Sequence, residues 1–170
     1  MLLRPLSDAD EPEIRAAQAE LAADGFDFLL DERDGEPWPA YVARVASWRD
    51  GRGLSPGFVP STFLVAEVEG QVVGRVSIRH ELTPWLREFG GHIGYGVRPG
   101  FRRRGHATEI LRQALGIARA AGVTEALVTC DEDNVASAAT IEACGGRFER
   151  LTVPEPDAPR KRRYWVPTLV

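Results

Sequence analysis

Apolar residues recur at helical spacing along several segments of the chain. The clearest stripe lies within residues 105–121, where apolar side chains follow one another three or four positions apart. Its members are Ala107, Ile110, Leu111, Ala114, Leu115 and Ala118. A continuous stripe of this kind predicts a helix that packs on a sheet. Two other predicted helices cover residues 8–24 and 39–49. A further helix is predicted to begin at a cap, either Asp133 or Asn134, and to end at Gly145-Gly146.

Shorter apolar runs between these helices are typical of strands. The predicted strands cover residues 2–6, 62–68, 71–81, 92–98, 124–130, 147–153 and 163–167. Glu69-Gly70-Gln71 is a hairpin turn between the second and third strands, and residues 154–159 form the loop between the last two. The order is therefore β-α-α-β-β-β-α-β-α-β-β. It contains hairpins and one β-α-β crossover, which predicts an α/β (α+β) fold with a mixed sheet.

Length and composition narrow the class of protein. A chain of 170 residues, 44% of them hydrophobic, predicts one domain over residues 1–170. The formal net charge of −4 argues against general nucleic-acid binding. Cys130 and Cys144 have neither zinc-ribbon nor redox spacing, so no metal site is expected. No apolar run approaches 18 residues and no signal core precedes the first strand, so we expect a soluble, cytoplasmic protein without a membrane partner.

A run of arginines stands out against this acidic background, at the point where a predicted strand is followed by the helix predicted over residues 105–121. The segment is Arg102-Arg103-Arg104-Gly105-His106-Ala107-Thr108. A helix N-terminus presents unpaired backbone N–H groups and the positive end of the helix dipole, and glycine lets an anion approach the backbone closely. We therefore interpret the segment as a pyrophosphate cradle, with arginine side chains as further phosphate ligands. The alternative is a solvated basic turn.

Element order and motifs together resemble the GNAT superfamily of acyl-CoA-dependent N-acetyltransferases. The family signature Arg/Gln-x-x-Gly-x-Gly/Ala is matched from Arg102 to Ala107, and a second element is matched by Asn134, Ser137 and Gly145. The Arg163-Tyr164-Trp165 piece and the segment around Asn134 further resemble a branch of poorly characterised predicted acetyltransferases. The resemblance covers nearly the whole chain. It implies a mostly antiparallel sheet with helices on both faces, acetyl-CoA as the cofactor, and Asn134 and Ser137 among the cofactor-binding residues.

The strand before the cradle carries two glycines around a tyrosine, Gly94-Tyr95-Gly96-Val97. Glycine inside a strand often marks a bulge or a close backbone approach. In the resembled family this strand bulges away from its neighbour, and the pantetheine arm lies beside it. The resemblance therefore places Gly96 and Val97 at the cofactor, where the Val97 backbone N–H would stabilise negative charge on the thioester oxygen. A plain buried strand is the alternative.

Proton transfer is less well defined by the sequence. The family often has a tyrosine seven residues after the Asn134 position, as the acid that reprotonates the leaving thiolate, whereas this chain has Ile141. Water, Tyr95 or Tyr164 could supply the proton instead. The candidates for the general base that accepts the amine proton are Glu81, His92, His80, the acidic residues 131–133 and a water relay, of which we favour Glu81 or His92.

Six carboxylates within residues 24–36 suggest an acidic rim that attracts a cationic amine, although such a run is also typical of a solvated loop. We expect an N-acetyltransferase that moves the acetyl group of acetyl-CoA directly to a primary amine of a small molecule or peptide. The alternative is a non-catalytic sensor that binds acyl-CoA. A nucleotide hydrolase is disfavoured because the chain lacks a Gly-x-x-x-x-Gly-Lys-Ser/Thr motif. The resemblance also allows a homodimer.

Overall fold

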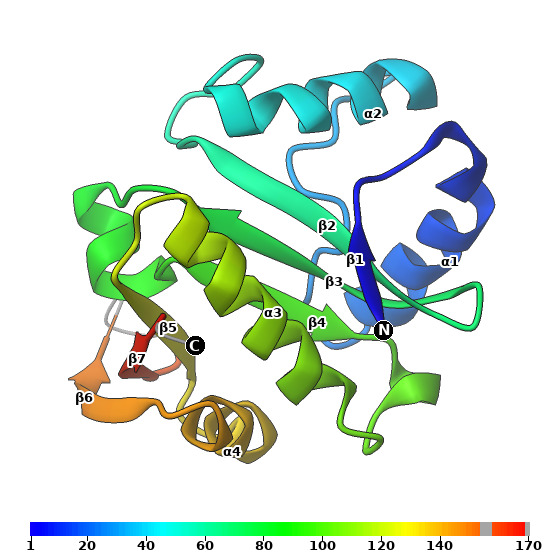
Figure 1. Ribbon diagram of the computed structural model, residues 1–170. Coiled ribbons are helices and arrows are strands. Elements are labelled where there is room, and N and C mark those ends of the chain that lie inside the picture. The colour runs from blue at the N-terminus through cyan, green and yellow to red at the C-terminus, as the bar shows by residue number, and fades with distance from the viewer. Residues whose placement is uncertain (154–157, 169–170) are drawn as a thin grey trace.

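The structure of the protein, a computed structural model, describes residues 1–153 and 158–168. Figure 1 shows two antiparallel sheets with helices packed against them. The first sheet has the order β1-β2-β3-β4, and the second has the order β5-β7-β6. The strands are β1 (Leu2–Arg4), β2 (Ser61–Val68), β3 (Gln71–Arg79), β4 (Ile93–Val97), β5 (Glu125–Asp131), β6 (Arg147–Thr152) and β7 (Lys161–Pro167). The expected fold class is confirmed.

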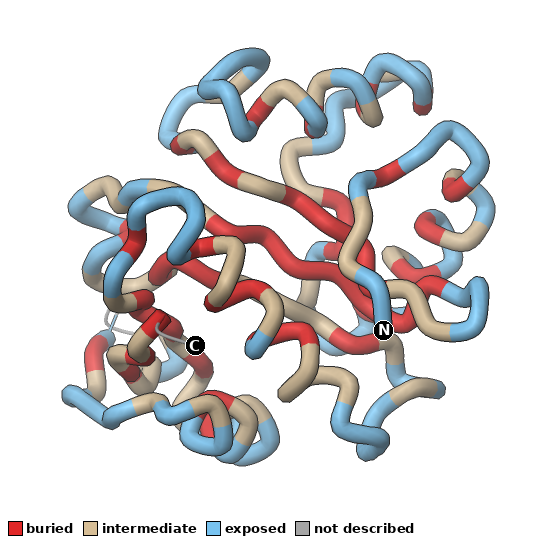
Figure 2. Tube along the Cα trace, in the orientation of Figure 1, coloured by how far each residue is buried: buried red, intermediate tan, exposed pale blue. Residues whose placement is uncertain are grey.

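Helices cover both faces of the four-stranded sheet. They are α1 (Glu11–Ala22), α2 (Trp38–Ser47) and α3 (His106–Ala120), whereas α4 (Val135–Ala143) packs on α3, β5 and β7. Helices α1 and α2 share one core with β2 and β3, whereas α3 packs on the opposite face of β3 and β4. The predicted stripe of α3 lies in this second core, where Ile110, Leu111, Ala114 and Ala118 are fully buried. In Figure 2 the central strands are buried and the outer helix surfaces are exposed.

Strands β4 and β5 run in the same direction, because α3 forms a β-α-β crossover between them. No ladder joins them, and they belong to different sheets. Their only tie in the described residues lies before β4 begins. There the His92 N–H donates to the Leu127 carbonyl oxygen at 2.7 Å, and the Leu127 N–H donates to His92 Nδ1 at 2.9 Å. Beyond this tie the two strands point apart (Figure 1), so one edge of β4 carries no partner strand from the part of the chain that the structure describes.

Several boundaries differ from the sequence expectations. A 3-10 turn at Asp8–Asp10 precedes α1, because the Asp10 carboxylate accepts the Ser7 N–H at 2.7 Å and also binds Arg4. The connection between β3 and β4 contains a π-helix, Leu86–Gly90. Further 3-10 turns that the sequence did not predict cover Trp48–Asp50 and Pro99–Phe101. Of the loop predicted over residues 154–159, residues 154–157 lie outside the described part of the chain.

Candidate active site

The turn between β4 and α3 presents a row of backbone N–H groups. Arg103 and Gly105 both have left-handed backbone conformations, with φ of 63° and 78°, and Gly105 is the N-cap of α3. Within the described residues, no acceptor meets the backbone N–H groups from Arg103 to Thr108. A Cβ added at Gly105 would meet no atom within 4 Å. Successive free N–H groups at a helix N-terminus are suited to bind an anion.

The three arginines of this turn do different things. The Arg102 side chain folds back, because its Nε donates to the Val97 carbonyl oxygen at 3.0 Å and its Nη2 binds the Asp24 carboxylate. It therefore ties the turn to β4 and to the end of α1. Arg103 and Arg104 are exposed and form no ion pair with any residue in the described ranges. Their side chains are available to an anion at the N-terminus of α3.

The two glycines of β4 have different surroundings. A Cβ at Gly96 would lie 2.6 Å from the Phe26 ring, so this glycine is required for packing. A Cβ at Gly94 would meet only Arg75 Nη1, at 3.9 Å, so that position is open. Arg75 is buried, lies 4.3 Å from the Phe26 ring centroid, and donates to the carbonyl oxygens of Gly94 and Asp27. Burial, and then the nearby Arg79, lower the pKa of Arg75 to about 9, which leaves it charged at neutral pH.

Tyr95 faces α4 from the open edge of β4. Its hydroxyl group shares a hydrogen bond of 3.0 Å with Ser137 Oγ. Asn134 caps α4 with its side-chain oxygen, which accepts the Ser137 N–H at 3.0 Å. Burial raises the pKa of Tyr95 to about 12, so the phenol keeps its proton at neutral pH. The structure thus brings together three residues that the sequence analysis selected from two distant segments.

The alternatives to Tyr95 have other partners. Ile141 is fully buried in the core, so the position of the family's tyrosine is filled by packing. The Tyr164 hydroxyl donates to Glu142 Oε1 at 3.1 Å. Burial raises the pKa of Cys130 and of Cys144, which keeps both thiols protonated and argues against a covalent acyl-enzyme.

The candidate bases do not converge on one carboxylate or imidazole. His92 Nδ1 accepts the Leu127 N–H, and burial, followed by Arg87, lowers the pKa of His92 to about 4. Its accepting lone pair is therefore occupied, which favours a positioning role over proton abstraction. His80 Nε2 lies 2.9 Å from Thr62 Oγ1, and Glu81 is exposed on the connection after β3.

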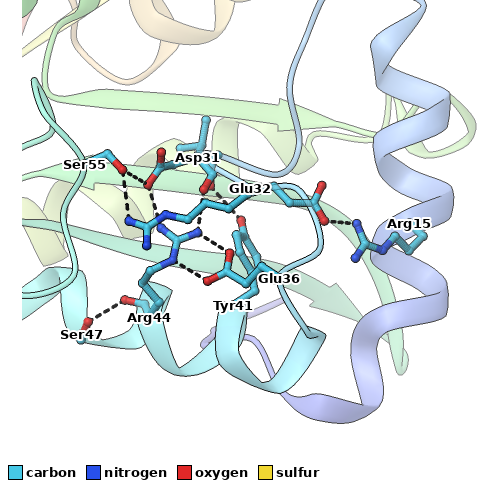
Figure 3. A network of polar contacts seen from close by, with 10 residues as sticks. Arg15, Asp31, Glu32, Glu36, Tyr41, Arg44, Ser47 and Ser55 are labelled. Atoms are coloured by element: carbon cyan, nitrogen blue, oxygen red, sulfur yellow. Dashed lines mark hydrogen bonds and ion pairs between the residues drawn. The ribbon is translucent and has the colours of Figure 1, made fainter.

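The acidic segment at residues 24–36 is largely neutralised by arginines (Figure 3). Arg44 binds both Asp31, with an Nη1–Oδ2 distance of 2.7 Å, and Glu36, with an Nη2–Oε2 distance of 2.6 Å. Glu32 pairs with Arg15. These pairs hold the segment in place, and they weaken the field that would attract a cationic amine.

A cavity of about 570 Å³ lies on the α2 side of β3, and sequence reasoning missed it. Trp48, Ser61, Ser77, Arg79 and Trp85 contribute to its walls. They come from the turn after α2, from β2, from β3 and from the connection to β4. No local motif joins such distant segments, although the alternation of Ser77 and Arg79 on β3 places both on one face.

Two kinds of feature are absent from the described residues. No group of three or more His, Cys, Asp or Glu side chains could hold a metal ion in that part of the chain. None of the helices in residues 1–153 and 158–168 combines the length and hydropathy needed to cross a membrane.

Comparisons with known proteins show that other chains share this fold. Solved structures of similar fold include yncA from Salmonella typhimurium with its cofactor acetyl-CoA, which is 16% identical with a TM-score of 0.64, covering 98% of this chain and 93% of that one. A ribosomal-protein-alanine N-acetyltransferase from Brucella melitensis is 21% identical with a TM-score of 0.67, covering 98% and 99% of the two chains. A mutant of the spermidine N-acetyltransferase SpeG from Vibrio cholerae is 14% identical with a TM-score of 0.65, covering 99% and 95%.

No curated protein matches the sequence. The sequence profile of the Acetyltransferase (GNAT) family matches residues 23–145, a range that includes β4, the cradle, α3 and α4. The chain belongs to the GNAT family of acetyltransferases.

Proposed function

We propose that the protein is an N-acetyltransferase that uses acetyl-CoA to acetylate a primary amine of a small molecule or peptide. The observation that carries this proposal is the row of free backbone N–H groups from Arg103 to Thr108, next to a strand edge without a partner. Family membership supports the acyltransferase chemistry.

The residues present fit the cofactor. Free N–H groups, the dipole of the 15-residue helix α3 and the open space at Gly105 suit a pyrophosphate, with the exposed Arg103 and Arg104 as further partners. Gly105, His106, Ala107 and Thr108 would contribute backbone contacts, and Asn134 and Ser137 would approach from α4. When bound, acetyl-CoA supplies an activated acetyl thioester for attack by the amine.

The edge of β4 would orient the reacting group. The Arg98 N–H donates to the Val73 carbonyl oxygen at 2.9 Å, so the alternating pattern of a strand turns the N–H groups of Val97 and Tyr95 away from β3. Both N–H groups therefore face the edge without a partner strand. Donors fixed in this way stabilise negative charge that develops on a carbonyl oxygen, and they need no reorganisation during the reaction.

Tyr95 would deliver the proton that the leaving thiolate requires. Its Oη keeps a proton at neutral pH, and the hydrogen bond to Ser137 fixes its orientation. For the proton lost by the amine we favour a water relay, because the accepting nitrogen of His92 is occupied. Glu81 stays an alternative as the final acceptor at the exposed end of such a relay.

Calorimetry and a thiol-release assay test the proposal. We expect heat from binding of coenzyme A and acetyl-CoA, and thiol release that depends on an added amine. No binding by folded protein would overturn the whole proposal. Saturable binding without thiol release from any amine in a broad panel would favour the acyl-CoA sensor instead.

The extent of the domain over residues 1–170, the cytoplasmic location and the homodimer stay predictions. Light scattering coupled to size-exclusion chromatography tests the homodimer directly.

A further inference from the structure

The cavity beside β3 lies next to the open position on β4. Ser77 lines the cavity and pairs directly with Gly94 in the β3–β4 ladder. Paired strands lie about 4.8 Å apart, and directly opposed residues share a face of the sheet. Gly94 has no side chain, and a Cβ there would meet only Arg75 Nη1 at 3.9 Å, so the space over Gly94 on this face is open. A small amine in the cavity would lie one strand away from the free edge of β4, on the face opposite α3.

Two groups of the cavity wall, the Arg79 guanidinium and the Trp48 indole, are hydrogen-bond donors that suit an anionic ligand. Arg79 Nη1 donates to the carbonyl oxygens of Gly90 and Gly91, at 3.2 and 2.9 Å, and no carboxylate of the described residues pairs with this guanidinium. Trp48 is fully buried, and its indole Nε1–H has no partner within the described part of the chain. A buried donor without an acceptor costs about 1–3 kcal/mol, so the Trp48 N–H favours an acceptor atom supplied by a ligand. The Arg79 guanidinium has backbone partners but no carboxylate partner in the described residues, so it can still pair with an anion.

The charge inside this part of the fold is positive. Arg75 and Arg79 lie four positions apart on β3, so their side chains share one face of the sheet. Arg75 Nε is also buried without a partner among the described residues. No Asp or Glu contributes to the cavity wall in the described part of the chain. The carboxylates of the nearby acidic segment pair with Arg44 and Arg15 (Figure 3), so they do not neutralise Arg75 and Arg79.

We propose that the cavity selects an acceptor amine that also bears a carboxylate, with Arg79 and the Trp48 indole N–H as its anion-binding groups. The proposal rests on the proposed acetyltransferase function. The volume of about 570 Å³ suits a small molecule the size of an amino acid. The exposed Trp85 and Phe58 at the rim add aromatic surface for an apolar side chain. The acceptor class is therefore an amino acid with an apolar or aromatic side chain.

Matched acceptor pairs test this inference. Thiol release is measured with phenylalanine, phenylalaninamide and 2-phenylethylamine, and with leucine and 3-methylbutylamine. We expect kcat/KM to be about ten- to a hundredfold higher for the carboxylate-bearing member, as for loss of a hydrogen bond to a charged group. Thiol release that is equally fast or faster with the amines that lack a carboxylate would overturn the carboxylate site and leave the acetyltransferase function intact.

Two variants assign the effect to the cavity. Trp48→Phe keeps an aromatic ring of smaller size and removes the unpaired N–H. Trp38→Phe is its control, because it makes the same change in size and the Trp38 indole donates to the Ser7 carbonyl oxygen outside the cavity. Arg79→Gln removes the charge, and Arg79→Lys restores it. We expect KM for phenylalanine to rise in Trp48→Phe and Arg79→Gln, with less change for 2-phenylethylamine and partial recovery in Arg79→Lys. A uniform loss for both acceptors would contradict the assignment.

Ligand binding to the cavity can also be measured without turnover, in case no amine releases thiol. Thermal shifts with coenzyme A present compare phenylalanine with 2-phenylethylamine in the wild-type protein and in Trp48→Phe. Stabilisation by phenylalanine alone, lost in Trp48→Phe, would support the anion site in a protein that does not acetylate. No stabilisation by either compound, together with no thiol release, would overturn it.

Discussion

Replacing Tyr95 by phenylalanine removes one hydroxyl group from the proposed site and leaves the ring in place. The lost contact is the 3.0 Å hydrogen bond to Ser137, whose net contribution to the free energy of unfolding is about 0.5–1.5 kcal/mol. A positioned general acid contributes about 10²–10⁴-fold to the rate, or about 3–5 kcal/mol of barrier. Since a thiol has a pKa of about 8.5, its thiolate leaves readily. We therefore expect kcat of Tyr95→Phe to fall by about a hundredfold, at the low end of that range.

The assay separates this role from a structural one. Thiol release gives kcat and KM, calorimetry gives the affinity for coenzyme A, and thermal unfolding gives stability. Tyr164→Phe is the matched control, because it breaks a similar hydrogen bond, of 3.1 Å to Glu142. We expect the control to lose stability without losing kcat. Because the pKa of Tyr95 is raised to about 12, wild-type kcat should show no alkaline decline below about pH 10 from this group. A folded Tyr95→Phe that keeps kcat within about threefold of wild type would refute the reasoning.

Three further predictions concern the cradle, the tie between the sheets and the packing of β4. Gly105→Val places a branched side chain at φ 78°, so we expect a strain of about 1–2 kcal/mol and at least about tenfold weaker binding of coenzyme A by calorimetry, with S-acetylpantetheine unaffected; unchanged affinity in a folded variant would count against the cradle. Folding lowers the pKa of His92 from 6.5 to about 4, so the unfolded chain binds this proton at a higher pH than the folded protein does. The free energy of unfolding should therefore be highest above pH 6.5 and decrease by on the order of 2 kcal/mol as the pH falls toward 4. His92→Asn keeps an acceptor for the Leu127 N–H, so urea unfolding at several pH values should show this dependence reduced, and an unchanged slope would exclude His92 as its source. Gly96→Ala forces a Cβ to within 2.6 Å of the Phe26 ring, so the urea midpoint should drop by the equivalent of about 1–3 kcal/mol, and an unchanged midpoint would mean that the ring moves freely.

The sequence predicted the parts of the fold that depend on local patterns. The apolar stripe of α3 could be found because a helix buries side chains three and four positions apart. The cradle could be proposed from the sequence because its glycine, its helix start and its arginines are contiguous from Arg102 to Thr108. The hydrogen bond between Tyr95 and Ser137 could not be predicted, because it depends on how β4 and α4 pack, although the sequence had indicated each residue separately.

Long-range side-chain pairing explains what the sequence could not predict. Arg102 belongs to the family motif, yet its side chain turns back to Val97 and Asp24, because a carbonyl and a carboxylate from distant segments lie within reach. The acidic segment looked like an attractive rim, yet Arg44 and Arg15 bind its carboxylates. The acceptor cavity combines segments that the chain order keeps apart, so no spacing rule could have revealed it.

The unpaired edges of β4 and β5 have a consequence for the stability of the protein. Exposed rims invite pairing with other chains, and natural proteins usually shield them. Here a ligand arm lying along β4 would supply the missing backbone partners, so coenzyme A would act as a removable piece of the sheet. At a concentration a hundred times its dissociation constant, such a ligand adds about 2.7 kcal/mol to folding stability. Metabolic supply of the acyl donor would then govern both the turnover rate of the enzyme and its resistance to aggregation.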